Sequence, residues 1–191
     1  MKHVKGTYWY IKRILDIIFS FILIIITLPL MLVVAICVLI GLGLPLYNQK
    51  RYREGLNKKT YLMFKFRTKL LNCDHLPLEK RYTKFSAALD ASRLNELPQL
   101  FNILKGDMSF VGPRPFIPGE PLPGGKVSEK RYLVRPGLTG LAFINGGVFL
   151  SHEAKLKYDE IYYDNFGFKQ DLIIVLKTPI ELIRQSRRDR W

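Results

Sequence analysis

The stretch LNELPQLFNILKGDMSFVGPRP, residues 94–115, carries most of the information about how this chain folds. With the residues before it, from 83 to 105, it predicts helix in two pieces that meet near Pro98, because proline is well tolerated early in a helix. Asn95 and Glu96 therefore fall at a helix junction. An amide and a carboxylate side by side at such a junction are candidates for a site rather than for a core.

Two short turns outside this junction each present one arginine. The first turn is Gly112-Pro113-Arg114-Pro115, at the end of the stretch. The second has the same combination of arginine, proline and glycine and is Arg135-Pro136-Gly137-Leu138-Thr139-Gly140. Proline and glycine fix the backbone of such turns, while a planar guanidinium offers paired donors to a phosphate or a carboxylate. Arg114 and Arg135 are therefore predicted to bind phosphate.

A second pair of cations lies on a predicted strand. Residues 61–68 alternate in polarity and read as a short strand, which would place Lys65 and Arg67 on one face. A solvated strand face would explain this pair equally well if it stood alone. Beside two arginine turns, the pair favours a phosphate site.

The N-terminal part of the chain is a membrane segment. Residues 17–46 form an uncharged run of 30 residues, rich in Ile, Leu and Val, which exceeds the roughly 20 needed to span a bilayer. Pro29 lies near its middle and removes one backbone hydrogen bond, so the helix should kink or break there. Ser20 and Thr27 are candidates to bond the freed backbone groups.

Charge around this run predicts how it enters the membrane. Both flanks are basic, with Lys2, Lys5, Lys12 and Arg13 before the run and Lys50, Arg51, Arg53, Lys58 and Lys59 after it. The positive-inside rule then places both flanks in the cytoplasm, which one straight span cannot satisfy. A re-entrant helix-break-helix hairpin with its bend at Pro29 is the prediction, and one tilted span kinked at Pro29 is the alternative.

Composition divides the chain into a membrane part, residues 1–46, and one polar domain, residues 47–191, predicted to be mixed α/β and rich in helix. The 30 Lys and Arg against 16 Asp and Glu give a formal charge of +14, which points to a polyanionic partner. Nucleic acid is disfavoured because no nucleic-acid module is recognisable, which leaves anionic lipid and phosphate-bearing substrates. Two cysteines and three scattered histidines provide neither a disulfide framework nor a zinc site.

Two segments near the C-terminal end leave alternatives open. Residues 171–184 have the pattern of an amphipathic helix, followed by a basic tail that ends in Trp191. This helix either packs on the core or lies at a membrane interface. The loop of residues 119–125 is either a mobile lid over a substrate or a surface excursion.

Together these residues resemble the bacterial sugar transferase family, specifically its small monotopic polyprenyl-phosphate phosphoglycosyl transferases. The resemblance covers nearly the whole chain, and its motifs are Lys12-Arg13 with Asp16, Gln49 and Arg51, Lys65-Phe66-Arg67-Thr68, the Leu94–Pro115 stretch and the Arg135–Gly140 turn.

The resemblance implies a re-entrant helix and a small domain on the cytoplasmic face of the bacterial inner membrane. It implies transfer of a sugar phosphate from a UDP-sugar to polyprenyl phosphate, with Mg²⁺ nearby and Glu96 as its protein ligand. In the family an adjacent aspartate attacks the β-phosphate, forms a covalent phosphosugar intermediate and releases UMP. A second copy of the chain and partner glycosyltransferases are further possible partners.

The chain departs from the family pattern at several positions. Asn95 replaces the nucleophilic aspartate, Asp90 stands where the family usually has an arginine, and Gly147 stands where it has another; the membrane break reads Leu28-Pro29 instead of Ser-Pro. A neutral amide is a poor nucleophile and a weak magnesium ligand. The covalent route is therefore expected to fail at Asn95.

Three explanations account for these departures to different extents. An engineered substitution explains Asn95 alone. A natural, catalytically inactive member, acting as a membrane scaffold or partner of an active transferase, explains all three positions. In the third, the site is rebuilt, with Arg93 replacing the lost arginine and Asp90, Asp107 or Glu96 as nucleophile. On one continuous helix, Asp90 would lie about 140° round from Asn95, which favours Glu96 among these.

Overall fold

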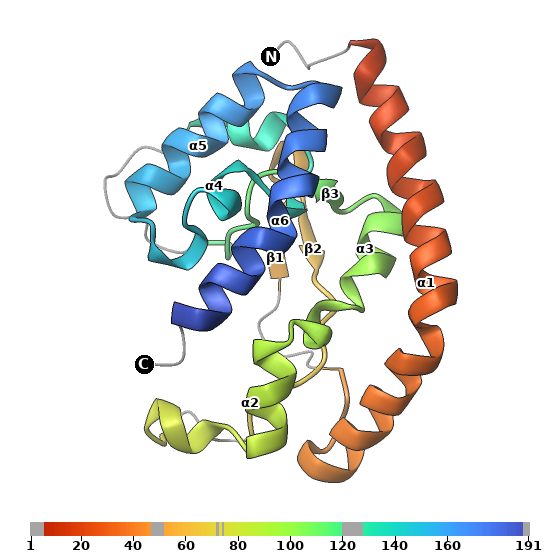
Figure 1. Cartoon of the computed structure of the whole chain (residues 1–191), viewed down its shortest axis with the longest axis vertical. Coiled ribbons are helices and arrows are strands. Elements are labelled where there is room, and N and C mark those ends of the chain that lie inside the picture. The colour runs from red at the N-terminus through yellow and green to blue at the C-terminus, as the bar shows by residue number, and fades with distance from the viewer. Residues whose placement is uncertain (1–5, 47–51, 72, 74, 120–127, 189–191) are drawn as a thin grey trace.

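The structure is a computed structural model that describes residues 6–46, 52–71, 73, 75–119 and 128–188. Helices dominate, and the strands form two small sheets (Figure 1). The α-helices are α1 (Thr7–Leu42), α2 (Lys84–Ala91), α3 (Gln99–Lys105), α4 (Leu141–Ile144), α5 (His152–Asp164) and α6 (Phe168–Arg188). The strands are β1 (Tyr52–Glu54), β2 (Thr60–Leu62), β3 (Ser109–Val111) and β4 (Gly137–Thr139). Short 3-10 turns include η3 (Leu94–Glu96), η4 (Glu129–Leu133) and η5 (Gly147–Phe149). The predicted mixed, helix-rich α/β class is confirmed.

Helix α1 forms an arc along one edge of the molecule and packs against α3 (Figure 1). Its inward stripe is buried and consists of Lys12, Asp16, Ser20, Ile24, Met31, Val34, Val38 and Leu42. The spacing of three, four or seven residues keeps these side chains on one side of a helix. Its other faces are apolar and exposed, and α1 is long and apolar enough to cross a membrane.

Pro29 lies inside α1, which stays helical from Thr7 to Leu42. The predicted break into two helices is therefore wrong; the proline is accommodated within one curved helix, as in the alternative of an interior kink. Thr27 Oγ1 donates to the Leu23 carbonyl at 2.6 Å, and Ser20 Oγ donates to the Ile17 carbonyl at 3.1 Å. Both hydroxyls thus bond carbonyls of their own helix. The backbone hydrogen bond that is missing at Pro29 bends the helix but does not break it.

Two hydrophobic clusters hold the polar domain together. The larger joins α1 to the domain through Ile24, Met31, Val34, Val38, Leu42, Tyr61, Phe66, Leu89, Leu100, Ile103 and Met108. The smaller lies among β3, α5 and α6 and contains Val111, Val134, Tyr162 and Ile174. Both halves of α1 contribute to the interior, so this long apolar helix is part of the domain core.

The sheets are minimal. Strands β1 and β2 form an antiparallel hairpin, while β3 and β4 pair in parallel with Ser109 opposite Gly137 and Val111 opposite Thr139. The predicted strand over 61–68 is wrong in extent, because β2 ends at Leu62 and only Phe66 makes a further bridge. Lys65 and Arg67 consequently do not share a strand face.

Three glycines allow the two arginine turns to cross at close range. A Cβ on Gly112 would lie 2.2 Å from the Arg135 carbonyl oxygen, and one on Gly137 would lie 2.1 Å from the Gly112 nitrogen. A Cβ on Gly140 would lie 2.2 Å from the Gly112 carbonyl oxygen. These neighbours are backbone atoms that cannot move aside, so the crossing requires glycine at all three positions.

We expect Gly137→Ala to lower the free energy of unfolding by about 3 kcal/mol, because the added methyl overlaps backbone that cannot relax. Thermal unfolding of the detergent-solubilised chain, followed by circular dichroism, measures the effect. Gly41→Ala is the control, since a Cβ at Gly41 meets nothing within 4 Å. Equal stability of the two variants would contradict a tight crossing.

Candidate active site

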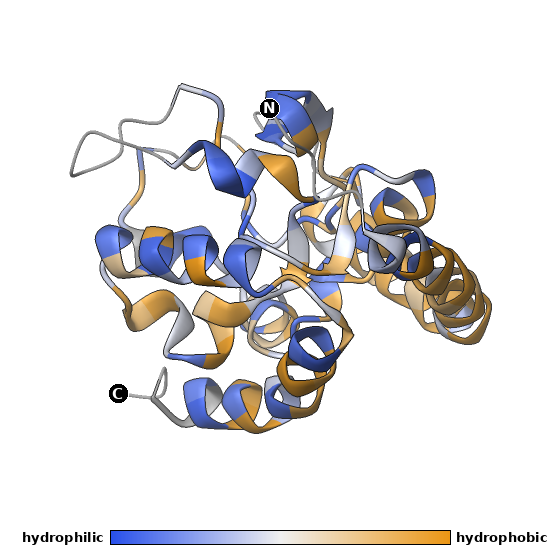
Figure 2. Cartoon of the chain, turned by 90° about the horizontal axis from the view of Figure 1, so that it is seen from above, coloured by the Kyte–Doolittle hydropathy of each residue, from blue (hydrophilic) through white to orange (hydrophobic). Residues whose placement is uncertain are grey.

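A cavity of about 910 Å³ opens between α1 and α6. Its walls are mainly apolar and include Phe19, Ile22, Leu23, Leu172, Val175 and Leu182. Hydrophobic residues dominate α1, whereas α6 alternates between hydrophobic and hydrophilic residues (Figure 2). The polar part of the lining consists of Tyr8, Lys12, Asp16, Arg93, Glu96, Arg114, Thr139, Asp171 and Thr178. The cavity therefore combines an apolar groove with a charged part.

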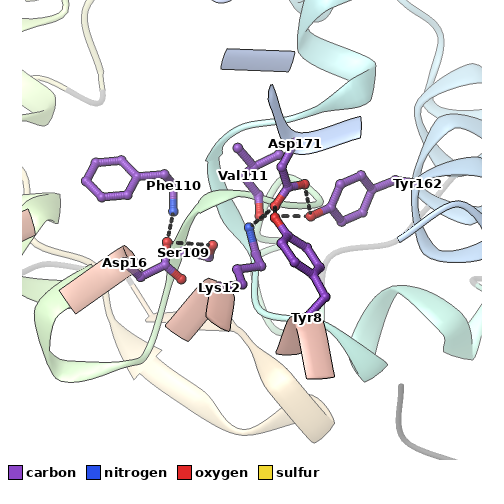
Figure 3. Close-up of polar contacts among 8 residues, drawn as sticks. All are labelled: Tyr8, Lys12, Asp16, Ser109, Phe110, Val111, Tyr162 and Asp171. Carbon is purple, nitrogen blue, oxygen red and sulfur yellow. Dashed lines mark hydrogen bonds and ion pairs between the residues drawn. The ribbon is translucent and has the colours of Figure 1, made fainter. Parts of the chain in front are cut away.

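Asp171, in the first turn of α6, is the meeting point of three donors (Figure 3). Its Oδ2 accepts from Lys12 Nζ at 2.5 Å and from Tyr8 Oη at 2.6 Å, and its Oδ1 accepts from Tyr162 Oη at 2.8 Å. Burial and the neighbouring Asp171 charge raise the pKa of Tyr162 well above its ordinary value, so the phenol keeps its proton and donates. This contact fixes α1 and α6, the two walls of the cavity, relative to each other.

Asp16 makes a second link from α1 to the domain. Its Oδ1 accepts from Ser109 Oγ and from the Phe110 amide, both at 3.1 Å (Figure 3). Arg13, one turn away, donates to the carbonyls of Ile103 and Leu104 at the end of α3. The polar residues before the apolar run therefore anchor the helix to the domain.

Glu96 lies at the helix junction that the sequence predicts. Its Oε1 is 3.1 Å from Lys65 Nζ and 3.5 Å from Arg93 Nη1. Arg93 adopts a left-handed conformation with φ of 60°, which ends the preceding turn and directs η3 toward the cavity. Arg93 and Glu96 both line the cavity, and Lys65 supports them from behind. Lys65 and Glu96, which the sequence names as candidate site residues, are thus brought together by the fold.

Asn95 is fully buried beneath this cluster, with 0% of its surface exposed. Its Nδ2 donates to Asp90 Oδ1 at 2.5 Å, and its backbone carbonyl accepts from the Phe66 amide. Asp90 also lies 3.9 Å from Lys65 Nζ. The expectation that Asp90 points away from Asn95 is wrong, because α2 ends at Ala91 and the left-handed Arg93 turns the chain back.

Arg114 lies at the rim of the cavity, as the sequence predicts. Its backbone carbonyl accepts from the buried guanidinium of Arg131, which also pairs with Asp159 of α5 at 3.2 Å. Burial raises the pKa of Asp159 to about 7, with Arg131 opposing the rise. Burial and the neighbouring Arg114 charge lower the pKa of Lys155 on α5. Lys155 is not among the residues that line the cavity.

Two predicted phosphate ligands lie elsewhere. Arg67 is buried, and its Nη1 lies 3.4 Å from the Leu42 carbonyl at the end of α1. Arg135 donates through Nε to the Gly106 carbonyl at 3.0 Å and stacks over the Trp9 ring, 5.1 Å from its centroid. Neither side chain lines the cavity. Arg67 contacts the end of α1 and Arg135 stacks on Trp9 of α1, so the structure does not bring them into the cavity; their binding of phosphate stays a prediction.

The remaining sequence candidates are also placed. Asp107 pairs with Lys105 and accepts from Asn102, away from the cavity lining. Gly147 has φ of 54°, and a Cβ there would lie 2.4 Å from Gln185 Nε2, so α6 already fills the space next to it. Gln49, Arg51, most of the loop of residues 119–125 and the terminal Trp191 lie outside the described residues.

Among the described residues that line the cavity, Glu96 is the carboxylate next to Arg93, and it is the protein ligand that the sequence names for a magnesium ion. Within the described part of the chain, no three Asp, Glu, His or Cys side chains gather closely enough to hold a metal ion. Glu96 reaches the cavity but is already paired with two cations. Mg²⁺ commonly binds through one or two carboxylates plus substrate phosphates, so Glu96 fits an ion that is carried mainly by a diphosphate.

The arrangement is an apolar groove that leads to a charged cluster. The family model described as "Bacterial sugar transferase" matches residues 7–185. The chain belongs to this bacterial sugar transferase family.

Curated relatives carry names of the same kind. The chain is 42% identical over 134 residues to an uncharacterized sugar transferase, EpsL, of Bacillus subtilis, covering 68% of this chain and 66% of the relative. It is 32% identical over 157 residues to the UDP-glucose:undecaprenyl-phosphate glucose-1-phosphate transferase of Xanthomonas campestris, covering 74% and 32%. It is 29% identical over 198 residues to the undecaprenyl-phosphate galactose phosphotransferase of Salmonella typhimurium, covering 93% and 41%. The chain thus spans between a third and two thirds of the length of these relatives.

We expect Asn95→Asp to destabilise the protein by about 3 kcal/mol at pH 8, since it places a second carboxylate in a buried position against Asp90. Part of the loss should return near pH 5, because two adjacent carboxylates then share a proton. Adding Asp90→Arg should restore stability at pH 8 by pairing the new carboxylate. Thermal unfolding across pH tests this, with the exposed Asn57→Asp as control. A double variant no more stable than Asn95→Asp would contradict the placement of this pair.

Proposed function

We propose that the protein transfers a sugar phosphate from a UDP-sugar to polyprenyl phosphate, as the first membrane step in making a bacterial surface polysaccharide or glycoconjugate. The carrying observation is one cavity in which an apolar groove between α1 and α6 meets Arg93, Glu96 and Arg114. A lipid phosphate has the same two parts, a long hydrocarbon chain and a charged head. The names of the relatives support the same pair of substrates.

The charged part of the cavity suits two phosphate-bearing substrates in turn. Arg114 and Arg93 line the cavity, and Lys65 and Arg93 flank Glu96. Preorganised cations stabilise charge that spreads over a phosphoryl group during transfer. A Mg²⁺ ion held by Glu96 and the donor's diphosphate would offset further negative charge there.

The apolar groove accounts for the lipid acceptor. Phe19 and Leu23 of α1 face Val175 and Leu182 of α6 across the cavity, and none of these side chains carries a charge. A polyprenyl chain entering from the bilayer can lie along them while its phosphate reaches Arg114. The hydrocarbon then stays in an apolar environment throughout the reaction.

Both ends of α1 contact the same domain, which supports a re-entrant arrangement without a broken helix. Lys12 and Asp16 bind near its start, and the carbonyl of Leu42 faces Arg67 at its end. A straight perpendicular span would carry one end away from the domain. An arc immersed in one leaflet, with the domain on the cytoplasmic side of the inner membrane, agrees with both contacts and with the basic flanks.

The exposed apolar face of α6 gives a second membrane contact. Val175, Leu176, Ile180 and Ile183 are between 48% and 68% exposed. Such a face lies comfortably at the boundary between lipid headgroups and chains. Helices α1 and α6 would then hold the cavity at the membrane surface, where both substrates can reach it.

An inactive scaffold is the second candidate function, and buried Asn95 favours it, since this amide neither ionises nor reaches the cavity. It makes an opposite prediction: such a scaffold would bind a transferase or substrate without releasing UMP from any UDP-sugar.

We expect UMP release from a suitable UDP-sugar in the presence of polyprenyl phosphate and Mg²⁺. Arg114→Met should lower kcat/KM by about 100-fold to 1000-fold, because it removes a cation from the transferring phosphoryl group. Arg135→Met, a matched change in the other turn, should leave the activity of the folded protein nearly unchanged. Absence of release over a broad panel of UDP-sugars would contradict the proposed function.

A further inference from the structure

A buried ion pair lies behind Arg114, outside the cavity. Arg131 of η4 and Asp159 of α5 approach each other to 3.2 Å, and their side chains are only 3% and 5% exposed. Neither residue lines the cavity, and neither was a candidate from sequence. Two charges taken out of water are stable only when partners satisfy them. The other contacts of Arg131 show what this pair holds in place.

Arg131 contacts the turn that presents Arg114 at two points. Its Nη2 donates to the backbone carbonyl of Arg114, and its guanidinium carbon lies 3.3 Å from the centroid of the Phe116 ring. A guanidinium is planar and carries several donors in a fixed geometry, so it can bond a carbonyl and a carboxylate together. One buried side chain thus connects the turn to α5.

The main chain of this turn depends on donors from other parts of the molecule. Its two prolines have no amide hydrogen. The carbonyls on either side of Arg114 accept from backbone amides at 2.9 Å, Gly137 bonding Pro113 and Glu54 bonding Phe116. Arg131 supplies the donor for the Arg114 carbonyl that lies between them. The main chain is therefore held along the whole turn, while the exposed Arg114 side chain reaches the cavity.

We propose that Arg131, held by Asp159, is a positioning residue for phosphoryl transfer. The inference rests on the proposed function. Arg131 does not touch the substrate; it fixes the main chain at Arg114, so that the Arg114 guanidinium is in place before the phosphoryl group arrives. A cation placed in advance stabilises developing negative charge without having to reorganise during the reaction.

The same two elements offer a matched control pair. Lys130, the residue before Arg131, pairs with Asp164 of α5 at 2.7 Å. These two side chains are 44% and 51% exposed, and Lys130 lies near the ring of Tyr163 instead of the Arg114 turn. Removing this pair changes the link between η4 and α5 but leaves the bond to the Arg114 carbonyl in place.

The test uses the full chain in detergent micelles or vesicles containing polyprenyl phosphate. UMP release is followed with the UDP-sugar of a broad panel that the unchanged chain uses best, and kcat and KM are determined separately. Arg131→Lys keeps a positive charge beside Asp159, but a single ammonium lacks the planar fork. Arg131→Met with Asp159→Asn removes both charges, so no unpaired charge stays buried. Lys130→Met with Asp164→Asn is the control, and thermal unfolding verifies that each variant is folded.

We expect both Arg131 variants to lower kcat by about 100-fold, because a small displacement of a group at the reacting centre has an effect of this size. KM for the UDP-sugar should stay nearly unchanged, since the misplaced contact matters most in the transition state. The control pair should keep nearly full activity. Unchanged kcat in the folded Arg131 variants would overturn the positioning role while leaving the proposed function intact.

A double-mutant cycle distinguishes positioning from a general loosening of the fold. If Arg131 acts through Arg114, adding Arg131→Lys to Arg114→Met lowers kcat no further than Arg114→Met alone. Losses that multiply, or failure of both Arg131 variants to fold, would assign the buried pair to stability alone. No UMP release by the unchanged chain over the whole panel would refute the proposed function and the positioning role together.

Discussion

The buried ion pair between Lys12 and Asp171 determines how the rest of the molecule is arranged. Taking two charges out of water is costly unless their remaining bonding capacity is satisfied. Here Tyr8 and Tyr162 satisfy the carboxylate, so a single side chain connects α1, α5 and α6. Because such a pair tolerates little displacement, the two walls of the cavity have a defined separation.

This constraint explains how a helix long and apolar enough to cross a membrane can also be part of a domain core. A helix bordered only by lipid has no hydrophobic force to hold it against a polar domain, because lipid chains are as apolar as its own side chains. Polar contacts at its start, from Lys12, Arg13 and Asp16, provide the attachment that apolar contacts cannot. The inward face of its second half, from Met31 to Leu42, then packs in the larger core.

The sequence alone predicted the parts of this structure that depend on local rules. The apolar run, the helix junction at Glu96 and the turn that presents Arg114 follow from composition, proline positions and motif spacing. Prediction from sequence failed where contacts between distant parts of the chain decide where a side chain lies. Arg135 has the same motif context as Arg114, and Arg67 was predicted on a strand face with Lys65, yet these two side chains bond the carbonyls of Gly106 and Leu42. No local pattern reveals which carbonyl each side chain meets. The left-handed conformation of Arg93 was likewise not predictable from local sequence. It turns the chain back, so that Asp90 contacts Asn95 instead of pointing away from it.

The charged side chains around the helix junction at Glu96 balance one another. Asp90 and Glu96 carry two negative charges, and Lys65 and Arg93 carry two positive ones, while Asn95, buried beneath them, is neutral. Two departures from the family pattern meet in this cluster, since Asp90 stands in place of an arginine and Asn95 in place of an aspartate. The two residues are compatible because the neutral amide donates to the Asp90 carboxylate. An aspartate at position 95 would instead bring a second anion to a buried position beside Asp90.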